Sequence, residues 1–263
     1  MKFSVRPLLA VILVIAAAAL AGCITIGNAN KPIATIIVPA TQAAPEHPLV
    51  VVLPGFGADA QDLHDHKLAD AVHKTWPQAD VLLTSATFAY YSQRNIVSRL
   101  DEDVIAPARR NGYRHIWLAG ASVGGMGVLF YEYAHPGEMT GFILLAPWLG
   151  SADLQDKIRA DGGVRQWNPG PLPATVNNDN YQQEMWRVVK NWSADPAAAQ
   201  RVWMVCGSDD RMLKGDQLLA TAIPASHFLQ IPGSHNWETF LRAAALIGTE
   251  INRPAQTGTI SAR

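Results

Sequence analysis

The chain has 263 residues, of which 49% are hydrophobic and 16% are charged. This length and composition suffice to bury one large core, so we expect a single globular domain, with or without a small insertion. The formal net charge is −1 and no run of Lys or Arg occurs, so the sequence excludes nucleic acid as the expected partner and shows no basic patch for anionic lipid.

The first 22 residues are predicted to be a signal peptide. Lys2 and Arg6 precede an apolar run over residues 8–20, which is the layout of a secretory signal and is shorter than the ~20 residues that cross a bilayer. The ending Leu-Ala-Gly-Cys at residues 20–23 resembles the lipobox of bacterial lipoproteins. The resemblance implies cleavage before Cys23, a diacylglycerol on its thiol and, because Ile24 rather than Asp follows, an outer-membrane position in the cell envelope. The alternative is an ordinary secretory peptide with an unmodified Cys23.

The rest of the chain shows one alternating pattern. Residues 23–46 are expected to form a tether and a first strand near 36–38, residues 47–252 the main domain, and residues 253–263 a tail. Within the domain, short apolar runs alternate with segments of helical periodicity, which predicts an α/β fold with a mostly parallel sheet flanked by helices. The predicted strands are 49–53, 81–84, 115–119, 142–146, 202–206 and 228–231, and the predicted helices are 63–76, 96–111, 123–134, 213–222 and 237–248.

Residues 150–196 interrupt the alternation. This stretch is too long for an ordinary connection between a strand and a helix, and it contains Trp167, Trp186 and Trp192. Two interpretations remain open: a cap or lid inserted over the edge of the sheet, or additional packing on the sheet.

Ser122 is the candidate nucleophile. It lies in a Gly-x-Ser-x-Gly motif at residues 120–124, directly after a predicted strand and directly before a predicted helix. Such a strand, tight turn and helix expose a serine hydroxyl at the carboxyl edge of a sheet, and the close packing there requires glycine at positions 120 and 124.

A serine needs a base to remove its proton and an acid to orient that base. His235 is the favoured histidine of the eight, because it lies in a turn between the last predicted strand and the last predicted helix. His47 and His115 lie at the opposite edge of the sheet. The candidate acids are Asp209 and Asp210, which follow the strand at 202–206.

These motifs together resemble the α/β-hydrolase superfamily over residues 48–248. In that family Gly-x-x-Asp often follows this strand, which implies that Asp210 pairs with His235 and that Asp209 is a neighbour. The resemblance also implies an oxyanion hole made by the backbone amides of Val123 and Phe56. Phe56 lies in Pro-Gly-Phe-Gly at residues 54–57, where Pro54 replaces the family's usual His, and Gly57 is the substitute for Phe56.

The family implies a Ser-His-Asp serine hydrolase that forms an acyl enzyme and needs no metal or organic cofactor. No metal-ligand pattern is evident, since His64 and His66 do not share a helix face. We expect a monomer that cleaves a carboxylic ester of a small or lipid-like acyl substrate and is held on the membrane by a lipid anchor at Cys23. A peptidase, amidase or thioesterase on the same triad remains an alternative, as does a non-catalytic binding lipoprotein.

Overall fold

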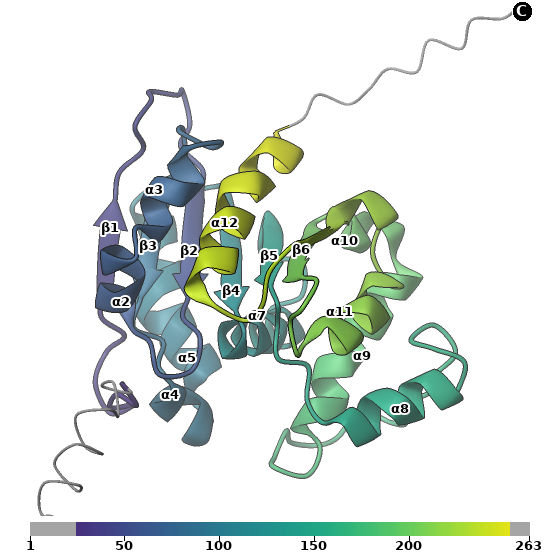
Figure 1. Cartoon of the computed structure of the whole chain (residues 1–263). Coiled ribbons are helices and arrows are strands. Elements are labelled where there is room, and N and C mark those ends of the chain that lie inside the picture. Colours follow the sequence, from purple (N-terminus) through teal and green to yellow (C-terminus); the bar gives the residue numbers. More distant parts are fainter. Residues whose placement is uncertain (1–24, 253–263) are drawn as a thin grey trace, which may run out of the picture.

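The computed structural model describes residues 25–252, which contain a seven-stranded sheet in the order β1-β3-β2-β4-β5-β6-β7 (Figure 1). β1 runs antiparallel to β3, and all other neighbours are parallel. The carboxyl ends of β2 to β7 therefore lie along one edge. The strands are β1 (Thr35–Val38), β2 (Leu49–Leu53), β3 (Asp80–Thr84), β4 (Ile116–Ala121), β5 (Gly141–Leu145), β6 (Val202–Gly207) and β7 (Phe228–Ile231).

Helices cover both faces of this sheet. One face packs against α2 (Ala60–Asp65), α3 (Leu68–His73) and α12 (Trp237–Ile251). The other packs against α4 (Phe88–Ser92), α5 (Ile96–Leu100), the π-helical segment η1 (Asp101–Ile105), α6 (Ala106–Arg110), α7 (Val123–Ala134), α9 (Tyr181–Ala194) and α11 (Leu213–Ala220). The remaining elements are α8 (Ala152–Ala160), α10 (Pro196–Ala199) and the 3-10 turn η2 (Ala225–His227).

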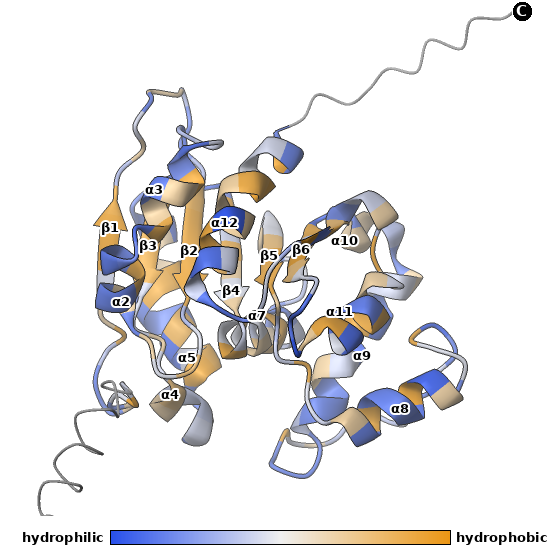
Figure 2. Cartoon of the chain, in the orientation of Figure 1, coloured by the Kyte–Doolittle hydropathy of each residue, from blue (hydrophilic) through white to orange (hydrophobic). Residues whose placement is uncertain are grey.

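The central strands are buried on both faces, which explains why they are continuous apolar runs. In β2, Val50 and Val52 pack under α3 and α12, whereas Val51 and Leu53 face the α7 side. Figure 2 shows these strands as the most hydrophobic part of the molecule. A parallel sheet between two helical layers needs this composition, since neither face meets water.

Two predicted helices differ from the structure. The helix expected at 63–76 is two short helices, because Lys67 adopts a left-handed backbone conformation with φ 62° between α2 and α3. The helix expected at 96–111 is continuous but widens into a π-helical turn over Asp101–Ile105. α4 was not predicted, because five residues are too few to show helical periodicity.

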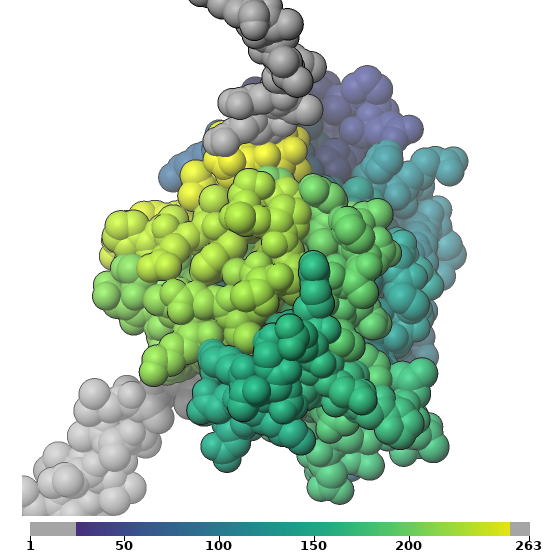
Figure 3. Space-filling view, turned by 90° about the vertical axis from the view of Figure 1, so that its right-hand side faces the viewer, coloured from purple at the N-terminus to yellow at the C-terminus, as the bar shows by residue number. Residues whose placement is uncertain are grey.

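The inserted residues 150–196 supply a layer of the fold as well as a loop. Trp167, Trp186 and Trp192 are 2% exposed or less, and the Trp192 ring lies 5.8 Å from that of Phe142 on β5. α9 packs beside α7. In Figure 3 the teal and green segments of the insertion cover the lower part of that face of the molecule.

The N-terminal segment packs on the domain from Thr25 onward. Its backbone bonds include Thr25 N to the Gly57 carbonyl, 3.0 Å, and Ala89 N to the Ile26 carbonyl, 2.9 Å. The expected tether is thus attached to the body well before β1. The predicted signal peptide, Cys23 and the tail at 253–263 lie outside the described residues.

Candidate active site

Ser122 lies in a sharp turn between β4 and α7. Its backbone has φ 52° and ψ −116°, a conformation that costs a non-glycine residue about 1–3 kcal/mol. Three hydrogen bonds hold the turn: Ser122 N donates to the Leu145 carbonyl at 3.0 Å, and the Ser122 carbonyl accepts from Gly125 N at 3.0 Å and Trp148 N at 2.8 Å. The residue is only 6% exposed. The strand, tight turn and helix that the sequence predicts around this serine are therefore present.

The glycines of the motif have no room for a side chain. A Cβ on Gly120 would lie 2.3 Å from the Gly124 carbonyl oxygen, and a Cβ on Gly124 would lie 2.3 Å from the Leu53 carbonyl oxygen. Gly125 is equally restricted, with Pro147 Cβ 2.5 Å away. These contacts bring the start of α7 directly against the end of β2.

His235 and Asp210 contact each other at the same edge of the sheet. His235 Nδ1 lies 3.0 Å from Asp210 Oδ1 and 2.9 Å from Oδ2. The Asp210 side chain is 0% exposed and that of His235 14%. Asp210 Oδ1 also accepts from Met212 N at 2.8 Å, which fixes the carboxylate.

The loops after β6 and β7 are joined by backbone hydrogen bonds, and these bonds bring Asp210 and His235 together. Ser208 N donates to the Ile231 carbonyl at 2.7 Å and Asp209 N to the Gly233 carbonyl at 2.8 Å. A Cβ on Gly207 would lie 2.3 Å from the Gly233 oxygen, so glycine is needed at this crossing.

The second candidate acid, Asp209, points elsewhere. It is exposed, and its side chain accepts from the Ser208 hydroxyl at 3.3 Å. Of the two carboxylates, Asp210 is the one at the His235 ring.

Other histidines have separate roles. His115 pairs with Glu46 at the amino edge of the parallel strands, 2.9 Å away. His227 stacks on Trp203 with ring centroids 3.7 Å apart, and its Nδ1 lies 3.0 Å from the Val202 carbonyl. His66 stacks on Trp237 at the start of α12.

The Ser122 hydroxyl and the His235 ring make no hydrogen bond with each other in the described part of the chain. They reach the same edge of the sheet from β4 and β7, which β5 and β6 separate. The structure thus brings the candidate base His235 into contact with the candidate acid Asp210, and Ser122, the candidate nucleophile, lies at the same edge without a hydrogen bond to them.

Two backbone segments with free amides meet at Ser122. A Cβ on Gly55 would lie 3.6 Å from Ser122 Cβ, so the loop after β2 passes beside the serine. The amides of Phe56, Gly57 and Val123 donate no hydrogen bond to another described residue. These are the donors that the sequence nominated for an oxyanion hole.

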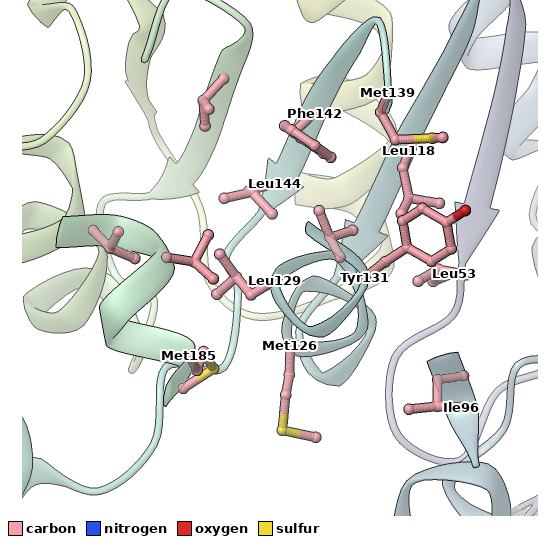
Figure 4. Close-up of a cluster of buried hydrophobic side chains, with 14 of the residues drawn as sticks. Leu53, Ile96, Leu118, Met126, Leu129, Tyr131, Met139, Phe142, Leu144 and Met185 are labelled. Atoms are coloured by element: carbon pink, nitrogen blue, oxygen red, sulfur yellow. The ribbon is translucent and has the colours of Figure 1, made fainter. Parts of the chain in front are cut away.

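A pocket of about 660 Å³ opens beside α7. Met126, Phe130 and Tyr133 line it, and their spacing of four and three residues puts them on one face of α7. Ser122, the residue that precedes this helix, is not itself among the lining residues. Figure 4 shows Met126 extending from α7 away from the strands. The opposite wall comes from Phe88 and Tyr91 of α4 and from Tyr181 of the insertion.

A tryptophan-rich insertion and Phe56 suggest an apolar acyl pocket on composition alone, but neither the three tryptophans nor Phe56 lines this one. Trp167, Trp186 and Trp192 are core residues. The lining residues on α4 were missed, since that short helix gave no periodic signal.

The described residues contain no group of three or more His, Cys, Asp and Glu that could hold a metal ion. Between residues 25 and 252, no helix is long and apolar enough to span a bilayer.

Similarity to known proteins exists at the level of structure. No protein-family model and no curated protein matches the sequence. Among solved structures, Est1E from Butyrivibrio proteoclasticus is 16% identical with a TM-score of 0.56, over 83% of this chain and 92% of that chain. The S-formylglutathione hydrolase FrmB from Staphylococcus aureus is 12% identical with a TM-score of 0.55, over 86% of this chain and 100% of its own.

FphF, a fluorophosphonate-binding serine hydrolase of Staphylococcus aureus, is 13% identical with a TM-score of 0.53, over 84% of this chain and 100% of its own. The mostly parallel seven-stranded sheet and its flanking helices, together with these neighbours, define the α/β-hydrolase fold.

Proposed function

We propose that the chain is a serine hydrolase that cleaves a carboxylic ester through an acyl enzyme. The observation that carries the proposal is the contact of the buried Asp210 with His235 at the sheet edge where the strained Ser122 also lies. Strained residues cluster at active sites, and nucleophilic catalysis needs both a positioned serine and an oriented imidazole at one edge of the sheet.

The chemistry follows from these positions. Asp210 holds His235 with Nδ1 as the donor, which leaves Nε2 free to take the Ser122 proton. Ser122 Oγ then attacks the ester carbonyl, the alcohol leaves with the proton from His235, and water releases the acid in a second, matching step. The first step requires Ser122 Oγ and His235 Nε2 to come within hydrogen-bond distance when substrate binds.

The developing oxyanion needs two preorganised donors. The amides of Val123 and Phe56 are the proposed pair, with Gly57 as the substitute for Phe56. Their lack of other hydrogen bonds and the approach of Gly55 to Ser122 support this role.

The pocket beside α7 favours a substrate with an apolar acyl group. Its walls are mainly aromatic and aliphatic side chains, and three of them belong to α7, the helix that starts directly after Ser122. Tyr91 also lines the pocket, and its buried Oη has no hydrogen-bond partner among the described residues. One structure of the neighbour Est1E holds ferulic acid, and the neighbour FrmB is named as an S-formylglutathione hydrolase. Because S-formylglutathione is a thioester, a thioester is the second candidate substrate.

A peptidase is less well supported. A peptide terminus would need a free charged clamp, for which the insertion contains Arg165, Arg187 and Glu184. Arg187 Nε lies 2.7 Å from Glu184 Oε2, and the same guanidinium donates to the carbonyls of residues 169–171. Two of the three groups are therefore already used inside the insertion.

The test is reaction of the purified protein with a fluorophosphonate probe and with p-nitrophenyl esters of increasing chain length. Ser122→Ala should abolish labelling and lower kcat by at least about 10³-fold. Ser208→Ala, an exposed serine near the site, is the matched control and should keep both. Equal labelling of wild type and Ser122→Ala would overturn the site, and labelling without hydrolysis of any ester would overturn the substrate class.

We also propose that Cys23 carries the lipid that holds the protein on the bacterial outer membrane. The lipobox-like ending at residues 20–23 supports this. Metabolic labelling with an alkyne fatty acid should mark the wild-type chain, and Cys23→Ala should remove the label and release the protein from the membrane fraction.

A further inference from the structure

Three large apolar side chains form an exposed patch, which we call the mouth face: Ile26, Phe56 and Phe88. They are 55%, 54% and 37% exposed. The rings of Phe56 and Phe88 meet edge to face with centroids 5.1 Å apart, and the Ile26 carbonyl accepts from Ala89 N, the residue after Phe88. The three residues are thus neighbours although they come from three separate segments.

The mouth face adjoins the candidate active site. Phe56 belongs to the loop that passes beside Ser122, and Phe88 lines the pocket along α7. α4 lies at the end of the molecule toward which the parallel strands point (Figure 1). Through Phe88, which belongs to both, the patch borders the pocket.

The N-terminal segment is fixed to the same place. Thr25 N bonds to the Gly57 carbonyl, and a Cβ on Gly27 would lie 2.0 Å from Thr87 Oγ1, so the segment lies tightly against α4 and the loop after β2. Cys23 precedes Thr25 by two residues, which limits its distance from Thr25 to about 7 Å. Acyl chains on Cys23 would therefore leave the protein beside the mouth face.

From this juxtaposition we propose that the mouth face lies on the lipid bilayer and that Ile26, Phe56 and Phe88 insert among the lipids. Two acyl chains suffice to hold a protein on a bilayer, and each exposed apolar side chain adds to the binding and fixes its orientation. The attraction is apolar, which agrees with a net charge of only −1. This orientation rests on the lipid anchor at Cys23 that is part of the proposed function.

The orientation also defines a substrate class, and this part rests on the proposed function. A pocket that opens onto the bilayer takes an acyl ester from the membrane surface without passing it through water. The substrate is therefore a membrane-resident lipid ester rather than a freely soluble one.

The orientation is tested on the full-length lipidated chain in phosphatidylcholine vesicles. Ile26→Cys and Ile37→Cys, each labelled with an environment-sensitive NBD dye, form a matched pair, since Ile37 is 49% exposed and pairs with Leu82 at the middle of β3, on the side of the sheet. The buried Cys206 should not react. We expect a blue shift and at least twofold stronger quenching by spin-labelled lipid at position 26 than at position 37. Equal quenching, or a chain that does not bind the vesicles, overturns the proposal.

The substrate class is tested with Ile26→Ser and Ile37→Ser. Ile26→Ser should keep fluorophosphonate labelling and hydrolysis of soluble p-nitrophenyl acetate but lose several-fold activity on a long-chain monoacylglycerol embedded in vesicles. Ile37→Ser should change neither. If Ile26→Ser left the vesicle activity intact, the membrane-resident substrate would be refuted. Absence of any labelling would instead refute the hydrolase, while the dye measurement would still decide the orientation.

Discussion

At Ser122 the backbone holds a left-handed φ of 52° that no local preference of serine explains. The strain is offset by the three hydrogen bonds of the turn and by the glycines that let β2 and α7 meet there. A residue kept in such a conformation by its surroundings is already positioned before substrate arrives, which lowers the entropic cost of the reaction.

At the residue scale, the adjacent carboxylates of Asp209 and Asp210 can be compared directly by mutation. Asp210→Asn should lower kcat for ester hydrolysis by about 10³-fold or more, because the amide no longer stabilises the imidazolium and favours the wrong His235 tautomer. Asp209→Asn, which changes an exposed side chain one residue away, should stay within about twofold of wild type. Steady-state kinetics at constant pH measures both, and a larger loss for the Asp209 variant would reverse the assignment.

Asp216 is a buried acid that the proposed mechanism does not use. It is 0% exposed, and burial raises its pKa well above its usual value of 3.8, although a contact with the Cys206 thiol opposes this shift. The nearby Asp210 charge raises it further.

Folding therefore favours the protonated form of Asp216. Its contribution to stability is fully present below about pH 3.8, its usual pKa, and is lost as the pH rises toward the raised folded pKa. The free energy of unfolding of Asp216→Asn should exceed that of wild type by a margin that grows with pH, by at most about 1.4 kcal/mol per unit. Urea unfolding between pH 5 and pH 8 measures this margin; a constant difference would show that Asp216 ionises without cost.

At the scale of elements, α7 connects the nucleophile to the pocket. One of its faces carries Met126, Phe130 and Tyr133 into the pocket, and its first turn packs on the backbone of β2. The small residues at the start of the helix are required by this packing, and the large ones further along it shape the pocket.

Two glycines near this junction should respond differently to alanine. Gly124→Ala places a Cβ 2.3 Å from the Leu53 carbonyl oxygen and should cost several kcal/mol, about 2–4, because backbone must move. Gly55→Ala meets only ordinary contacts at 3.6 Å and should change stability by less than about 1 kcal/mol. Denaturant midpoints measure both, and similar losses would mean that the β2 loop is packed more tightly than the contacts indicate.

At the scale of the whole molecule, the insertion is attached to the body by its core residues, and one ion pair holds two parts of the insertion together. The Glu184 side chain is 2% exposed and is paired with Arg187, whose guanidinium also holds the carbonyls of residues 169–171. The loop at residues 176–178, which forms part of the pocket wall, lies between residues 169–171 and α9.

Arg187→Gln should therefore destabilise the protein by roughly 3 kcal/mol, since it leaves a buried carboxylate unpaired. Arg187→Gln combined with Glu184→Gln should recover part of that loss, because no uncompensated charge remains. Thermal unfolding of the single and double variants measures the difference. A single variant as stable as wild type, with reduced cleavage of peptides, would favour the clamp of a peptidase instead.

Much of the fold follows from the sequence alone. The apolar runs at 49–53 and 202–206 match the bounds of β2 and β6 to within one residue. A strand buried on both faces is a continuous apolar run, so its ends are clear in the sequence. The glycines at positions 120 and 124 and the aspartates after β6 are local signals, since their chemistry depends on the residues directly beside them.

Other features depend on residues distant in the chain, and only the tertiary structure decides them. Asp209 and Asp210 are equivalent until the crossing of Gly207 over Gly233 turns one toward His235. Trp186 and Trp192 form core rather than pocket because α9 packs on α7. The mouth face joins residues 26, 56 and 88, which no periodicity connects. Sequence patterns indicate which side chains are buried, whereas packing between distant segments determines which residues those side chains contact.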